Sequence, residues 1–159
     1  MLSILRTFCE TGSIGPVSCG MSLAHVQDLI GPFDHRQEPP SAHCLHIWQD
    51  LELLVDTGTG LVVQVGLLAG GWGELRLPAA LGGVFGTPEM GPSVDAVLRA
   101  LDKAGVTWSE APEQVVGDEA RVVRVEETGV LLHFHPYEGK GCPHGDAGLL
   151  ALHCATRSA

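Results

Sequence analysis

The chain has 159 residues, of which 9 are lysine or arginine and 19 are aspartate or glutamate, and its formal net charge at pH 7 is −10. This balance argues against a protein that binds nucleic acid through phosphate contacts, because such contacts need a basic surface. It favours a basic partner instead, and the alternative is that a net charge of this size simply keeps the protein in solution. With 45% hydrophobic residues, a chain of this length can bury the core of one globular domain over 1–159.

No segment approaches the length of a membrane-spanning helix, so we expect no membrane partner. The N-terminal residues lack the early basic region and the long apolar run of a secretory signal. The five cysteines form an odd set without the spacing of a disulfide framework, which fits reduced thiols. We therefore expect a cytoplasmic protein.

The first expected elements are two helices. Residues 2–10 can form a short helix, and residues 20–32 have the pattern of a capped amphipathic helix. Ser22 is the expected N-cap, because its hydroxyl can accept a hydrogen bond from a backbone N–H of the first turn. Gly31 and Pro32 then end the helix.

The segment 45–56 alternates between apolar and polar residues, which predicts one strand with a half-buried face. A turn at 56–60 leads to a β-rich return strand at 61–68, so we expect a hairpin. The alternation places two groups on opposite sides of the strand: Leu45, Ile47, Leu51, Leu53 and Val55 on one side, and His46, Trp48, Asp50 and Glu52 on the other.

The second half of the chain repeats this order. Residues 91–105 again combine an expected Ser93 N-cap, apolar positions at helical spacing and a terminal glycine. Helices followed by strands favour an α+β fold with the helices on one face of an antiparallel sheet. Two tandem helix-plus-antiparallel-sheet repeats, over 20–78 and 91–155, would form one continuous two-layer domain. The later strands are expected at 74–77, 106–108, 121–125, 130–135 and 148–154.

The segment Gly20-Met21-Ser22, followed by Val26 and Gly31, resembles the motif G-M-[ST]-x-x-x-V-x-x-x-x-G. This motif opens the helix–sheet repeats of the β-lactamase inhibitory protein family and also occurs in small outer-membrane assembly lipoproteins. The resemblance implies a binding module, in which helices pack on an antiparallel sheet and two such units make a concave surface for a partner. The second half departs from the motif, because no methionine follows Gly91.

The uncovered face of such a sheet is the expected binding surface. Trp48, Asp50 and Glu52 share the polar side of the predicted strand, where an exposed tryptophan among acids suits a contact hot spot for a protein partner. The alternative is that a helix covers Trp48. Trp72, which lies in a glycine-rich loop, is the next candidate for a contact residue.

A histidine and cysteine group near the C-terminal end is a candidate metal site. His133 and His135 are two apart in a predicted strand, so they face the same side. With Cys142 and His144 in the following glycine-rich loop, they could supply four ligands to a zinc ion. The spacing matches no standard zinc motif, and the alternative is that the two histidines pack at the sheet surface.

No complete catalytic motif is present in the sequence, since the glycine-rich runs lack the ending of a P-loop and there is no Gly-x-Ser-x-Gly elbow. We therefore expect a non-enzymatic, cofactor-free binding protein, most concretely an immunity-type inhibitor of a bacterial toxin or enzyme. Its acidity would steer it toward a basic partner. The alternatives are a zinc-binding protein and a structural subunit of a larger assembly.

Overall fold

The computed structural model describes residues 2–38, 42–68, 74–86, 92–117, 121–136 and 147–155. Within these segments the protein has a mixed α+β fold, which confirms the predicted fold class. The helices are α1 (Leu2–Thr11), α2 (Leu23–Ile30) and α3 (Val94–Ala104), with short 3-10 helices η1 (Ala79–Leu81) and η2 (Pro112–Gln114). The strands are β1 (His35–Gln37), β2 (His43–Trp48), β3 (Leu51–Asp56), β4 (Val62–Leu68), β5 (Glu74–Arg76), β6 (Val84–Gly86), β7 (Trp108–Glu110), β8 (Arg121–Val125), β9 (Leu131–Pro136) and β10 (Ala147–Ala155).

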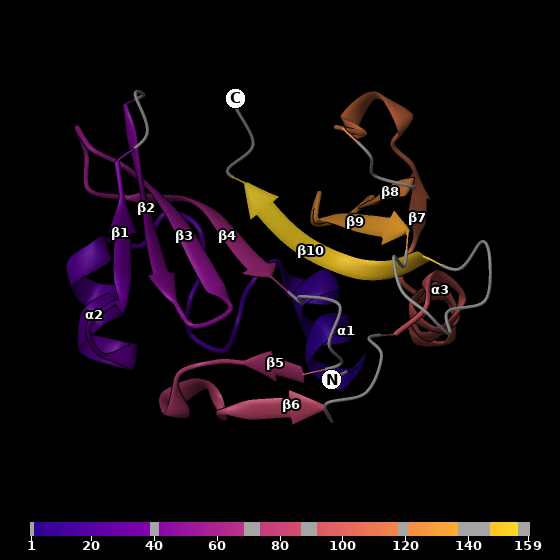
Figure 1. Ribbon diagram of the computed structural model, residues 1–159, viewed down its shortest axis with the longest axis horizontal. Helices are drawn as coiled ribbons and strands as arrows, with labels where there is room; N and C mark the ends of the chain where they lie inside the picture. Colours follow the sequence, from indigo (N-terminus) through magenta and orange to yellow (C-terminus); the bar gives the residue numbers. More distant parts are fainter. Residues whose placement is uncertain are drawn as a thin grey trace.

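The large sheet has eight strands in the order β1-β2-β3-β4-β10-β9-β8-β7, and its neighbouring strands are antiparallel. In each half of the chain a helix precedes four strands, which follow one another in the sheet from its edge to its centre. The two sets meet where β4 pairs with β10 (Figure 1). The small β5–β6 sheet lies between the two halves in the sequence. The halves thus share one order of elements, while a tandem repeat over 20–78 and 91–155 stays a prediction.

Local chemistry explains where α2 and α3 begin. The Ser22 hydroxyl accepts a hydrogen bond from the His25 backbone N–H at 3.3 Å, and the Ser93 hydroxyl accepts one from the Ala96 N–H at the same distance. Each bond satisfies a backbone donor that the first helical turn leaves without an intrahelical partner. Glycine ends both helices, since the backbone φ after α3 is 73° at Gly105, a value that glycine adopts without strain. The predicted caps of both helices are confirmed.

The single strand predicted over 45–56 is wrong, because the chain turns back at Gln49 and Asp50. These two residues separate β2 from β3, and Gln49 has a φ of 55°. The Asp34 carboxylate accepts a hydrogen bond from the Gln49 backbone N–H at 2.8 Å. Since Trp48 pairs with Leu51 across the hairpin, their side chains share one face of the sheet. The alternation along β2 is therefore opposite to the predicted one.

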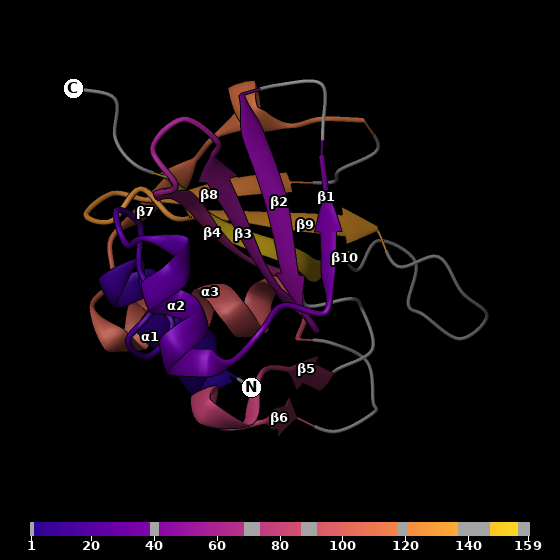
Figure 2. The same cartoon turned by 90° about the vertical axis from the view of Figure 1, so that its left-hand side faces the viewer.

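The three helices lie on the same side of the large sheet, α2 under the first half of the chain and α3 under the second, with α1 between them (Figures 1 and 2). Against them packs one core cluster with residues from both halves of the chain. None of the described helices is long and apolar enough to cross a membrane. The large fully buried side chains of this core include Phe8, Trp48, Leu51, Leu53, Leu67, Leu101, Leu132 and Phe134.

The opposite side of the sheet is covered only in part within the described chain. The short helix η2 contacts β8 and lies beside a small second cluster of three buried residues: Ala111, Val122 and Leu131. This cover belongs to the second half of the chain. The corresponding side of β2, β3 and β4 carries residues that remain partly exposed.

Candidate functional site

The best candidate site is the side of β2, β3 and β4 that points away from the three helices. We call it the open face and define it by Leu45, Ile47, Glu52, Leu54 and Gln64, which are all half-buried. The strand registers place these residues together, because Leu45 pairs with Leu54 and Ile47 with Glu52, while Gln64 pairs with Leu54. Three apolar and two polar side chains thus share a partly exposed surface.

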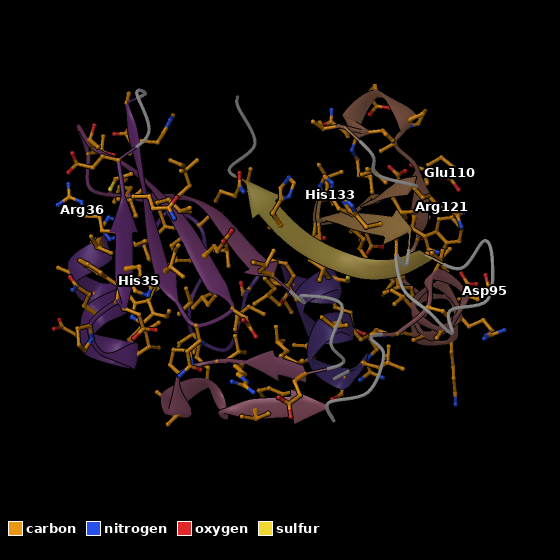
Figure 3. The ribbon with its side chains drawn as sticks, viewed as in Figure 1. His35, Arg36, Asp95, Glu110, Arg121 and His133 are labelled. Carbon is orange, nitrogen blue, oxygen red and sulfur yellow. The ribbon has the colours of Figure 1, made fainter. Side chains whose placement is uncertain are left out.

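The open face continues onto β10 at the centre of the sheet. Glu52 pairs with Gly66, and Gly66 pairs with His153, so no side chain projects between the Glu52 carboxylate and the His153 imidazole along this row. The His153 ring stacks on the ring of His133, with centroids 4.8 Å apart and planes inclined by 24°. Figure 3 shows His133 on the side of β10 away from α1.

Glu52 was predicted to lie on the exposed side of its strand, and its side chain is indeed partly exposed, on the side of the sheet away from the helices. Within the described part of the chain, no hydrogen bond or ion pair to its carboxylate is formed. Burial raises the pKa of Glu52 above its ordinary value, because partial loss of hydration disfavours the charged carboxylate. The open face therefore carries a partly desolvated acid on β3, in the row of residues next to the β2–β3 turn.

Asp50 has a structural contact instead. Its carboxylate accepts a hydrogen bond from the Arg76 backbone N–H at 2.6 Å, and its own N–H donates to the Arg76 carbonyl at 3.0 Å. Asp50 lies in the turn between β2 and β3, so these bonds fix that turn to the β5–β6 hairpin. The expectation that Asp50 and Glu52 share one side of a single strand is wrong for the same reason as the strand itself.

The prediction that Trp48 is exposed on the polar side is also wrong. Only 2% of its surface is accessible, and its indole N–H donates to the Gly31 carbonyl at 2.9 Å. The Phe33 ring meets it edge-on, with centroids 5.8 Å apart. The alternative, that a helix covers this residue, is confirmed by the contact with the C-terminal end of α2. A side chain so buried is a core residue, and a partner cannot reach it in this structure.

Three predicted site residues lie outside the described residues: the metal ligands Cys142 and His144, and the contact residue Trp72. His133 and His135 occupy alternate positions of β9; His133 is 9% exposed and His135 is half-buried. Among the residues that the structure describes, no group of three or more potential ligands is close enough to hold a metal ion. The four-residue zinc site stays a prediction.

The histidines around Cys44 point in different directions and form no common site. His43 lies across from Asp56, with 4.0 Å between its Nε2 and the carboxylate, while His46 is buried on the helix side. Arg36 reaches the Cys44 sulfur with its Nε at 3.0 Å. Burial lowers the pKa of His46, and the nearby Arg36 charge lowers it further. Both effects favour a neutral imidazole in the core.

Much of the positive charge in the described chain is neutralised locally. Each of five arginines lies beside a carboxylate a few residues away in sequence or on a neighbouring element, which leaves the acidic excess at the surface. The pairs are Arg6–Glu10, Arg36–Glu38, Arg76–Glu74, Arg121–Glu110 and Arg124–Glu113.

A shallow depression between α1 and α3 offers a different surface. It is lined mainly by apolar side chains, with one thiol, Cys9, and one guanidinium, Arg6. Burial, assisted by the nearby charge of Glu10, raises the pKa of Cys9 to about 12. A thiol with that pKa is almost fully protonated at neutral pH and is a poor nucleophile. The depression therefore fits helix packing better than chemistry.

Comparison with protein-family models, with curated proteins and with solved structures gave no match in any of the three.

Proposed function

We propose that this chain is a non-enzymatic binding protein that docks a basic protein partner on the open face, in the manner of a cytoplasmic immunity-type inhibitor. The observation that carries the proposal is the placement of the helices, which pack on one side of the large sheet and leave half-buried apolar residues on the other side. Partly exposed apolar side chains around a polar group are typical of protein-docking surfaces.

Charge supports a basic partner. The chain carries a net charge of −10, and the ion pairs described above already neutralise several of its arginines. Long-range attraction between an acidic inhibitor and a basic toxin or enzyme accelerates encounter. A sheet surface can then cover the active site of the partner without any chemistry of its own.

The proposal is tested by capture of partners on immobilised protein at low ionic strength, followed by mass spectrometry and by a mutational footprint. Ile47→Arg puts a bulky positive charge into the open face and should weaken a captured basic partner at least ~10-fold. The matched control is Leu29→Arg, because Leu29 is an exposed leucine on α2. Equal loss of binding in both variants, or none in Ile47→Arg, would contradict docking on the open face.

A further inference from the structure

We infer that Glu52 is the anchor of this surface and that it receives a lysine or arginine side chain of the partner. The inference rests on the proposed function, because it specifies which group of the open face selects the partner. It concerns a single carboxylate and its charge, whereas the proposed function concerns the whole surface.

Glu52 differs from the other acidic residues of comparable burial. In the described part of the chain four acids are half-buried, and three of them have donors: Asp50, Asp56 and Glu74. Asp50 accepts from the Arg76 backbone, Asp56 from the Thr59 backbone N–H at 2.7 Å, and Glu74 from the Arg76 guanidinium at 2.9 Å. The Glu52 carboxylate alone in this group has no such contact within the described residues.

The neighbours of Glu52 explain why the described part of the chain gives its carboxylate no donor. Ile47 on β2 is apolar, and Gly66 on β4 has no side chain. A methyl group added at Gly66 would lie 3.7 Å from the Glu52 Cβ and 3.6 Å from its carbonyl oxygen, which is ordinary contact distance. The sheet thus holds a carboxylate beside a position where no side chain competes for it.

A partly desolvated carboxylate without a partner is unfavourable in the isolated protein, because it has lost water and gained no compensating bond. A cationic side chain from another molecule would remove that cost. It would form a charge-assisted hydrogen bond with the carboxylate, in a surface from which docking removes more water. A neutral side chain would instead leave the carboxylate more deeply buried and still unpaired. The geometry therefore favours cationic partners and penalises neutral ones.

The first test uses a defined probe, N-acetyl-L-arginine amide, with its neutral isostere N-acetyl-L-citrulline amide as the control ligand. The carboxyl carbon of Glu52 is followed by NMR over a pH titration at constant ionic strength. The arginine probe should move the titration midpoint to lower pH, because a nearby cation favours the carboxylate, and it should shift the Gly66 amide. The citrulline probe should do neither.

Two variants make the result specific. Glu52→Gln keeps the shape of the side chain and should abolish the response of the Gly66 amide, whereas Asp28→Asn removes an exposed acid on α2 and should leave that response intact. The inference is overturned if the midpoint does not move, if citrulline moves it equally, or if the Gly66 response persists in Glu52→Gln.

The same variants separate this inference from the proposed function. Against a captured partner, Glu52→Gln should weaken binding about 10-fold or more, with the folded state at least as stable as before. If Ile47→Arg disrupts the complex and Glu52→Gln does not, the partner docks on the open face but Glu52 is not its anchor. If neither variant affects the complex, the partner does not dock on the open face. The arginine probe still tests independently whether Glu52 binds a cationic side chain.

Discussion

The two halves of this protein have the same order of elements but differ on the side of the sheet that faces away from the helices. In the second half, Val122 and Leu131 are buried beside η2, with 1% and 9% of their surfaces accessible. In the first half, Ile47 and Leu54 remain half-buried. The same arrangement of a helix and four strands can thus have both faces of its sheet covered, or one face covered and the other accessible to a partner. The difference arises from η2, which comes directly after the edge strand β7, and it places the candidate docking surface in the first half.

The largest expected effect concerns the covered face. Trp48→Ala should lower the free energy of unfolding by about 3–5 kcal/mol, because it removes a large core side chain together with the indole bond to Gly31. Urea denaturation followed by circular dichroism measures this loss. A loss below ~1 kcal/mol would mean that Trp48 is exposed in solution, which would restore it as a contact residue.

A paired substitution tests the difference between the halves directly. Leu131→Arg should cost roughly 3 kcal/mol or more, because it places a charge in a buried cluster. Ile47→Arg should change the free energy of unfolding by less than ~1 kcal/mol, because the charged group can reach water. Thermal unfolding of the two variants side by side gives the comparison. Similar losses would show that the open face is covered after all.

The two helix caps should be equivalent in energy if the halves are alike at this level. Ser22→Ala and Ser93→Ala each remove one side-chain bond of 3.3 Å to a backbone N–H. Each should lower the free energy of unfolding by about 1 kcal/mol. Ser18→Ala serves as a control, because Ser18 caps neither helix. A large inequality between the two variants would indicate that one helix depends on packing much more than the other.

The smallest expected effect is on the pH dependence of stability at the open face. The pKa of Glu52 is raised in the folded protein, so folding favours the protonated carboxyl. The stability from this preference is fully present below the unfolded value of about 4.5 and is lost as pH rises through the folded value. Glu52→Gln should therefore stabilise the protein at pH 7 and have little effect at pH 3. Denaturation curves at both pH values test this, and destabilisation at pH 7 would show that the carboxylate has a partner.

The local sequence was sufficient for much of the scaffold. The pattern around Ser22 and Ser93 predicted both capped helices, because capping and amphipathic spacing are properties of neighbouring residues. The hairpin between β3 and β4 was predicted as well, since its turn contains the residues that such turns need. The acidic balance also follows from composition alone.

The tertiary structure decided which face each strand presents. The turn at Gln49 and Asp50 lacks the Asn-Gly or Asp-Gly signal of tight hairpins, and the alternation before and after it looks continuous in the sequence. Because side chains alternate with a period of two, this one turn reverses the side on which β2 places every residue. It buries Trp48 under α2 and leaves Leu45 and Ile47 on the open face.

The sequence by itself thus determined the capped helices, the turn between β3 and β4 and the negative charge, because these depend on composition or on residues a few positions apart. Only the tertiary structure decided that Trp48 belongs to the core and that Glu52, Gly66 and His153 form one row across neighbouring strands. Those relations depend on the register of β3 with β4 and of β4 with β10, which is far from β4 in the chain. Register is fixed by burial and pairing across the whole sheet, and no local pattern encodes it.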